Sequence, residues 1–197
     1  MFQRDYALGK RIAVRGVTGS GKSTLTRALG EALGLRVIEL DAIQWQTPGW
    51  QPMPADEFRA GIEAALAAAP TGWVCDGNYT AESRGMLAQA DTLIWLNLPW
   101  RVTFWRLLKR TFSRAAKREL LWGTQRESLR QTLLSRNSIL WWSISHYRDS
   151  VRHSRALLAE TRHARTYELR SAQEVRELLE VARRQTVTLS AYNEPQA

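Results

Sequence analysis

Short apolar runs alternate with helical patterns along most of the chain, and this alternation predicts the fold class. Residues 11–17 place Ile12, Ala13 and Val14 side by side ahead of a glycine, which predicts a short buried strand. Further strands are predicted at residues 37–40, 73–75, 93–98 and 166–169. Residues 93–98 are continuously apolar apart from Asn97, and such a run is typical of a strand buried on both faces of a parallel sheet.

Helical patterns fill the gaps between these strands. Leu25 and Leu29 recur on one face of the first helix, and Gly34 supplies its stop signal. Helices are expected at residues 22–33, 54–70 and 171–184. Strands and helices in this order predict an α/β domain with a parallel sheet and right-handed crossovers.

Residues 101–155 follow a different pattern. An apolar stripe and a row of arginines recur at helical spacing on two faces. The stripe consists of Val102, Trp105, Leu108 and Phe112, and the arginines are Arg106, Arg110 and Arg114. We expect two or three helices in this segment and no strand.

The length of 197 residues suits a single domain over residues 1–197. We expect its core at about residues 10–100 and 156–184, with residues 101–155 as a helical insertion. Residues 185–197 lack helical periodicity and are expected to fray.

Charge is concentrated in the insertion. The whole chain carries a net charge of +9, yet residues 1–100 carry nine basic and ten acidic side chains. Residues 101–155 carry thirteen basic and three acidic side chains, whereas residues 156–197 are balanced. Such a segment attracts polyanions such as nucleotide phosphates, nucleic acid or acidic lipid. A solvated helical face is the alternative interpretation.

The remaining composition bounds the class of protein. A hydrophobic fraction of 44% excludes wholesale disorder. Cys75 is the single cysteine, so no disulfide can form within the chain, which suits a reducing compartment. No signal peptide is visible, and the most apolar stretch is too short to span a bilayer. We therefore expect a cytoplasmic location.

A phosphate-binding loop is the strongest motif. Residues 16–23 read G-V-T-G-S-G-K-S, which matches G-x-x-x-x-G-K-[ST] between a predicted strand and a predicted helix. In such a loop backbone N–H groups surround the phosphates of ATP, the lysine reaches the β- and γ-phosphates, and the serine ligates Mg²⁺. The candidate nucleotide-binding residues are Gly16, Thr18, Gly19, Ser20, Gly21, Lys22, Ser23 and Thr24.

Two carboxylates follow predicted strands, where ligands of open parallel sheets bind. Asp76 follows residues 73–75 and resembles a Walker-B acid, which holds Mg²⁺ through water and accepts a hydrogen bond from Ser23. Asp41 lies where a phosphoryl acceptor would bind, and it could orient or deprotonate an acceptor hydroxyl. Each could instead cap a turn or helix.

With these residues in place, the chain resembles small-molecule P-loop kinases of the adenylate kinase and shikimate kinase type. Residues 76–79, D-G-N-Y, occupy the place of the D-G-F-P-R motif of adenylate kinases. The arginine of that motif has no match at the same spacing, and Arg84 is the nearest candidate.

The chain is more closely similar to the kinase-like DNA topology modulation proteins of the FlaR family, over roughly residues 10–182. The likeness rests on Leu40-Asp41, the Trp45…Pro48-Gly49-Trp50 loop, D-G-N-Y, residues 95–99 (W-L-N-L-P), and residues 119–128 with their E-L-L-W-G and R-E-S motifs.

This resemblance implies a P-loop NTPase three-layer fold with a five-stranded parallel sheet and an arginine-rich helical lid. It implies that one of Arg106, Arg110, Arg114 and Arg126 neutralises the transferring phosphoryl group, and that Ser171, Ala172 and Gln173 lie near the adenine. Around the acceptor it implies Asp41, Trp45, Trp50, Asp76, Asn78, Tyr79 and Arg84. Core packing is the alternative for any one tryptophan.

The leading hypothesis is an ATP- and Mg²⁺-dependent kinase that acts on a small molecule. One alternative is a nucleotide-regulated, nucleic-acid-associated protein that affects DNA topology, in which residues 101–155 bind phosphates, although no groove-entering motif is recognisable. A nucleotide-binding module without turnover is a third interpretation, which Lys22, Ser23 and Asp76 disfavour. The sequence does not name the acceptor.

Overall fold

The computed structural model describes residues 6–47, 51–117, 120–121, 125–126 and 145–192. Five parallel strands form one sheet in the order β2-β3-β1-β4-β7. They are β1 (Arg11–Gly16), β2 (Arg36–Glu39), β3 (Trp73–Asp76), β4 (Thr92–Leu96) and β7 (Arg165–Leu169). The parallel five-stranded sheet predicted from the apolar runs is thus confirmed. Strands β3 and β2 lie on one side of β1, and β4 and β7 lie on the other. The chain therefore changes the side on which it adds strands at β1, and ligands of such sheets bind at this switch point.

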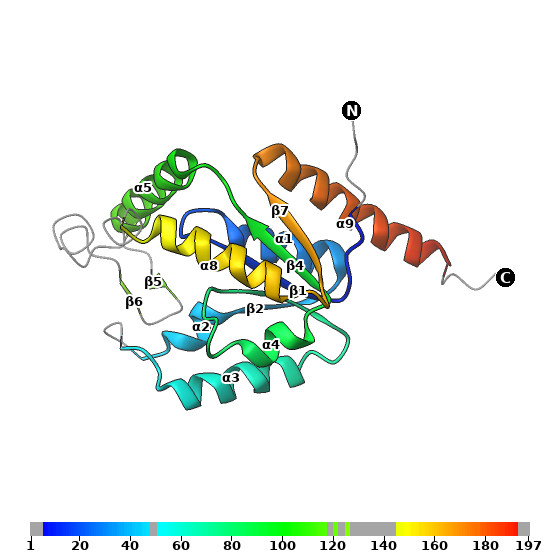
Figure 1. Cartoon of the computed structure of the whole chain (residues 1–197), viewed down its shortest axis with the longest axis horizontal. Helices are drawn as coiled ribbons and strands as arrows, with labels where there is room; N and C mark the ends of the chain where they lie inside the picture. Colours follow the sequence, from blue (N-terminus) through cyan, green and yellow to red (C-terminus); the bar gives the residue numbers. More distant parts are fainter. Residues whose placement is uncertain (1–5, 48–50, 118–119, 122–124, 127–144, 193–197) are drawn as a thin grey trace.

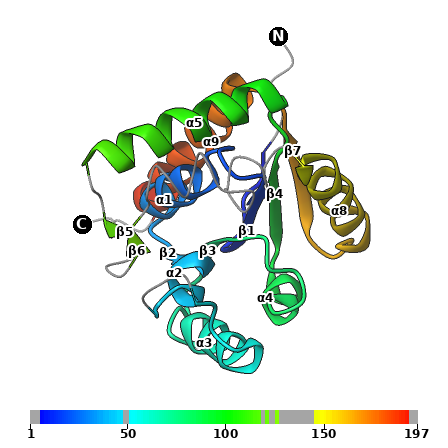
Figure 2. The same ribbon diagram turned by 90° about the vertical axis from the view of Figure 1, so that its left-hand side faces the viewer.

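Helices cover both faces of the sheet, which makes three layers (Figure 1). On one face lie α1 (Lys22–Leu33) and α9 (Ala172–Tyr192); α3 (Ala55–Ala67), α4 (Arg84–Gln89) and α8 (Tyr147–Glu160) cover the other. The short α2 (Leu40–Gln44) follows β2 directly. Figure 2 views the molecule from the side on which α5 (Trp100–Lys117) lies.

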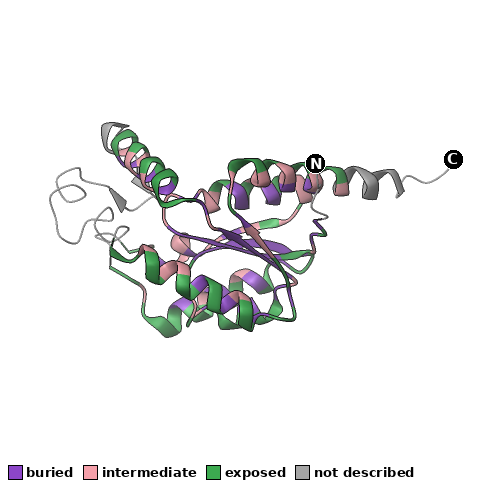
Figure 3. Cartoon of the chain, turned by 45° about the horizontal axis from the view of Figure 1, so that its top comes forward, coloured by how far each residue is buried: buried purple, intermediate pink, exposed green. Residues whose placement is uncertain are grey.

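Each face of the sheet packs on its own apolar cluster. Ile12, Leu29 and Leu178 belong to the cluster under α1 and α9, while Phe58 and Trp73 belong to the cluster under α3, α4 and α8. Figure 3 shows the strands as the most buried part of the fold. The continuous apolar runs therefore reflect burial on two faces. None of the helices in the described ranges has the length and apolar character needed to cross a membrane.

The insertion contains strands, contrary to the expectation of helices alone. The two-residue strands β5 (Leu120–Leu121) and β6 (Gln125–Arg126) pair in antiparallel fashion. Pieces this short carry no apolar periodicity, so the pattern of side chains could not indicate them.

The expectation of a frayed tail is wrong as far as Tyr192. Helix α9 continues through residues 185–192. The sequence holds no glycine or proline between Ser171 and Glu194, so nothing stops a helix that adds one backbone hydrogen bond with each further residue.

The apolar stripe of the insertion is not the buried face of α5. Trp105 is 59% exposed, and Val102 and Phe112 are also exposed. The buried positions are instead Leu107 and two threonines, at 103 and 111. The surface beneath α5 is the polar phosphate loop, and this explains why that helix turns a mixed face inward.

Candidate active site

The phosphate loop occupies the turn between β1 and α1, as its motif predicts. Gly19 and Gly21 have φ angles of 77° and 93°, which favour glycine. A Cβ on Gly19 would lie 2.3 Å from the carbonyl oxygen of Thr103, so α5 packs directly on the loop. Gly21 precedes the first residue of α1, and the partial positive charge of the helix N-terminus therefore lies at the loop.

Asp76 ends β3 beside this loop and is 3% exposed. The Ser23 hydroxyl lies beside its carboxylate and favours the charged form. Burial raises the pKa of Asp76 to about 6, although the nearby Ser23 hydroxyl and the charge of Lys22 partly oppose the rise. Its second oxygen, Oδ2, is buried without a hydrogen-bond partner.

These residues fit a hard divalent cation. Mg²⁺ prefers oxygen ligands and keeps several waters, and a hydroxyl beside an unpartnered carboxylate oxygen offers such a site. A cation bound by Ser23 and Asp76 would also offset the cost of a buried negative charge.

Residues after Asp76 connect the loop to the predicted acceptor side. The Asn78 side chain donates a 2.8 Å hydrogen bond to the carbonyl oxygen of Gly16, the first residue of the phosphate loop. The Tyr79 hydroxyl donates a 2.7 Å hydrogen bond to Asp41 Oδ1, and Trp45 Nε1 donates to the Tyr79 oxygen at 3.1 Å. One segment thus positions both the phosphate loop and the Asp41 carboxylate.

Asp41 lies in the first turn of α2 and is half-buried. Its charge contributes to the raised pKa of Asp76, so the two carboxylates lie near one another. Hydrogen bonds therefore join Asp41, Trp45 and Tyr79, whereas Asn78 uses its amide on the phosphate loop.

Two of the candidate lid arginines contact the loop. Arg106 Nη1 donates to the backbone oxygen of Ser20 at 3.2 Å, and Arg110 Nη2 donates to the Thr18 hydroxyl at 3.4 Å. Arg114 is half-buried on the same helix. Arg126 lies in β6, and its side chain is outside the described residues.

Other candidates have different surroundings. Arg84 is exposed at the start of α4, and Trp50 lies outside the described residues. Ser171 caps α9, because its hydroxyl accepts a 3.1 Å hydrogen bond from the backbone N–H of Glu174. Ala172 and Gln173 are exposed beside it, and Gln173 donates to Glu177 at 2.9 Å.

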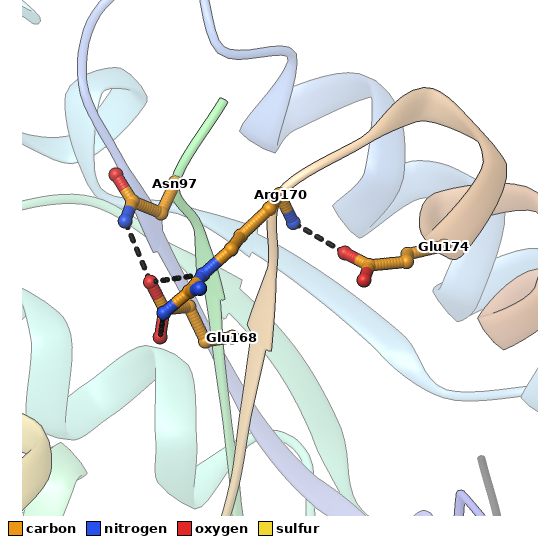
Figure 4. Close-up of polar contacts among 4 residues, drawn as sticks. All are labelled: Asn97, Glu168, Arg170 and Glu174. Carbon is orange, nitrogen blue, oxygen red and sulfur yellow. Dashed lines mark hydrogen bonds and ion pairs between the residues drawn. The ribbon is translucent and has the colours of Figure 1, made fainter. Parts of the chain in front are cut away.

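A polar network at the ends of β4 and β7 was not predicted (Figure 4). Glu168 accepts hydrogen bonds from Asn97 at 2.6 Å and from two nitrogens of Arg170 at 2.9 and 3.0 Å. Glu174 in turn accepts from the backbone N–H of Arg170, the residue before the helix cap Ser171. The S-x-x-E spacing of Ser171 and Glu174 is the sequence signal that would have indicated the helix cap. Arg170 holds the pKa of Glu168 below its usual range.

Sequence reasoning also missed Arg15, which is 2% exposed on β1 immediately before the loop. Its Nη2 donates to the Thr80 hydroxyl at 2.8 Å. A charged residue within the otherwise apolar run of residues 12–17 was the available signal.

Comparison with known proteins supports the fold. No family model matches the chain. A cytidylate kinase of Pyrococcus horikoshii is 31% identical over 134 residues, which cover 55% of this chain and 65% of that kinase. The chain thus spans just under two thirds of the curated relative's length.

Two solved shikimate kinases share the architecture. That of Acinetobacter baumannii, in complex with shikimate, has a TM-score of 0.51 at 21% identity and covers 94% of each chain. That of Bacteroides thetaiotaomicron has a TM-score of 0.53 at 16% identity, over 90% of this chain and 98% of that one. The chain therefore has the three-layer α/β fold of these P-loop kinases.

Proposed function

We propose that this protein is an ATP- and Mg²⁺-dependent kinase that transfers the γ-phosphoryl group to a small-molecule acceptor. The observation that carries the proposal is the buried Asp76, with an unpartnered carboxylate oxygen, beside Ser23 and a phosphate loop whose glycines adopt positive φ angles. The partial likeness to a cytidylate kinase supports it.

Each part of the site has a role in such a transfer. Loop N–H groups and Lys22 would bind the phosphates, and Ser23 with Asp76 would hold Mg²⁺, which neutralises phosphate charge. Arg106 and Arg110 already contact the loop, so they are placed to stabilise charge that develops on the transferring group. Catalysis would come from positioning and electrostatics.

Asp41 would act on the acceptor. Tyr79 fixes its carboxylate, and a fixed carboxylate near Asp76 can orient an acceptor hydroxyl or accept its proton. We infer an acceptor pocket around Asp41, Trp45 and Tyr79, with Trp50, Asn78 and Arg84 as further candidates and with Ser171, Ala172 and Gln173 on the adenine side.

Similarity to the FlaR family, a cytoplasmic location and the nucleic-acid alternative stay predictions. Because Arg106 and Arg110 point to the phosphate loop, the geometry favours the lid interpretation of α5 over a phosphate-binding outer surface.

The test is ATP consumption by the full chain with Mg²⁺ against a library of metabolites and nucleotides. We expect turnover with at least one acceptor and its loss in Lys22→Ala. Lys10→Ala is the matched control, since Lys10 is exposed immediately before β1 and outside the loop. Equal turnover of Lys22→Ala and the wild type would show the proposal to be wrong.

A further inference from the structure

Arg15 lies at the end of β1, on the acceptor side of the sheet. Side chains alternate along a strand, so Arg15 shares a face with Ala13, which belongs to the cluster under α3, α4 and α8. Its partner Thr80 follows Tyr79, the residue that holds Asp41. The guanidinium therefore lies near the start of the phosphate loop and is hydrogen-bonded to the segment that holds Asp41.

The guanidinium is incompletely satisfied. One nitrogen, Nη2, donates to Thr80, whereas Nε and Nη1 are buried without a hydrogen-bond partner. Burial lowers the pKa of Arg15 to about 10, so the group remains charged at neutral pH. The neighbouring Cys75 gives no compensating charge, because burial and Asp76 raise its pKa and keep it a neutral thiol.

A buried charge without a counter-ion is costly, and an anionic ligand that pairs with it would remove that cost. ATP is not that ligand, because its phosphates belong in the loop that opens into α1, whereas Arg15 shares the opposite face of the sheet with Ala13. An anionic oxygen on the acceptor would reach Arg15 by joining or replacing the half-buried Thr80 hydroxyl.

We propose that Arg15 recognises an anionic group, a carboxylate or a phosphate, on the phosphoryl acceptor. This inference rests on the proposed kinase function and deepens it. It narrows the acceptor to a molecule that carries both a hydroxyl for transfer and a nearby negative charge. Arg15 then determines specificity, and Asp41 acts on the hydroxyl.

The first experiment tests anion binding without knowledge of the acceptor. Thermal midpoints are measured against sodium phosphate and sodium acetate, at constant ionic strength, for the wild type, Lys22→Ala and Arg15→Met. Phosphate can also bind the loop, so Lys22→Ala isolates the second site. We expect Lys22→Ala to keep a saturable response to at least one anion and Arg15→Met to lose the corresponding response.

Controls separate charge from folding. Arg11→Met removes an exposed arginine of the same strand and should respond like the wild type. Arg15→Lys keeps a buried cation and should retain part of the response. Because Arg15→Met removes a buried charge, it should melt no lower than the wild type in the absence of anions. No anion response in Lys22→Ala, or an equal response in Arg15→Met, would overturn the proposal.

The second experiment distinguishes the two sources of charge. Binding of cytidine monophosphate is compared with cytidine, and binding of shikimate with its methyl ester. We expect one anion to bind the wild type more tightly than its neutral analogue, and Arg15→Met to lose at least about tenfold of that preference. Equal binding of both members of both pairs would contradict the inference. Loss of ATP turnover in Lys22→Ala is measured separately, so a failure of the kinase proposal is distinguishable.

Discussion

Tyr79 donates a 2.7 Å hydrogen bond to the carboxylate of Asp41, although the two residues follow different strands of the sheet. Trp45 donates to the same tyrosine oxygen at 3.1 Å, and the Tyr79 ring packs edge-on against Phe58 with centroids 4.9 Å apart. Burial and the Asp41 charge raise the pKa of Tyr79, so it stays a protonated donor. Asp41 is therefore held in one orientation at the mouth of the site.

Asp41→Asn should lower kcat with little change in ATP affinity, since the side chain acts on the acceptor rather than on the nucleotide. Steady-state kinetics and direct nucleotide titration check the two parts. If the variant mainly loses nucleotide binding, Asp41 acts on the nucleotide and the acceptor role is wrong.

Tyr79→Phe tests whether orientation of Asp41 matters. It removes only the hydroxyl, and we expect kcat to fall by about three- to tenfold in the wild-type background. In an Asp41→Asn background the same change should cost less, because the partner carboxylate is already gone. Additive losses in the double variant would mean that Tyr79 acts independently of Asp41.

The core of this fold was predictable because short-range rules decide it. Continuous apolar runs marked the strands, and the glycine-rich loop between residues 11–17 and the first helix matched the observed strand–turn–helix unit. Its glycines take positive φ angles that few other residues adopt. Here local sequence and tertiary structure agree.

Other features depend on partners distant in the chain. The buried face of α5 is set by the phosphate loop, which lies more than eighty residues earlier in the chain. The apolar stripe that includes Val102 and Phe112 therefore did not indicate the buried face. The proposed role of Arg15 depends on its hydrogen bond to Thr80, which lies 65 residues later in the chain. Neither relationship leaves a periodic signal in the sequence.

Asp76→Asn should weaken the Mg²⁺ dependence of turnover. The amide keeps the size of the side chain and can still contact Ser23, but it is a poorer ligand for a hard cation. A rise of about tenfold or more in the Mg²⁺ concentration for half-maximal rate is expected. Unchanged Mg²⁺ dependence would remove Asp76 from the metal site.

The same variant tests the raised pKa of Asp76 through the pH dependence of the unfolding free energy, measured with a metal chelator present. The folded-state pKa of Asp76 is raised from 3.8 to about 6, so the folded protein binds the extra proton between these values. Stability therefore falls as pH rises through this window, and the penalty is complete above about pH 6. Asp76→Asn has no carboxylate to ionise and lacks this penalty. The difference in unfolding free energy between Asp76→Asn and the wild type should therefore shift in favour of the variant by about 1–3 kcal/mol between about pH 4 and pH 7. Thermal or urea unfolding at both pH values checks this. A gain that is independent of pH would contradict the raised pKa.

Gly19→Ala should distort the phosphate loop. Its φ of 77° is strained for alanine, and the added Cβ would meet the Thr103 carbonyl oxygen at 2.3 Å. We expect a loss of about 1–3 kcal/mol in unfolding free energy and at least tenfold weaker ATP binding. Gly85→Ala is the control, since Gly85 lies in α4 with nothing within 4 Å of its Cβ position, and it should be neutral or slightly stabilising. Wild-type ATP affinity in Gly19→Ala would show that the loop tolerates a side chain.

The arginines of the insertion decide between a lid over ATP and a nucleic-acid surface. Arg106 and Arg110 contact the Ser20 carbonyl oxygen and the Thr18 hydroxyl, so they already lie beside the position of the phosphates. Contacts that strengthen only as charge develops lower the chemical barrier more than they aid binding, and arginines in related chemistry contribute about 10³–10⁵ in rate. We therefore expect Arg106→Ala or Arg110→Ala to reduce kcat by more than about tenfold with a much smaller change in apparent ATP affinity. Arg114→Ala and Arg126→Ala complete the set of lid candidates.

Exposed Lys109 lies on the same helix, and Lys109→Ala is the matched control, expected to leave kcat unchanged. A nucleic-acid surface would behave differently, because each lost cation would weaken DNA binding modestly and reduce the salt slope by about one unit, with Lys109 included. The four arginine variants and the lysine control are therefore measured in both assays. Unchanged turnover in every arginine variant, together with equal losses of DNA affinity for arginine and lysine, would overturn the lid interpretation and favour the nucleic-acid surface.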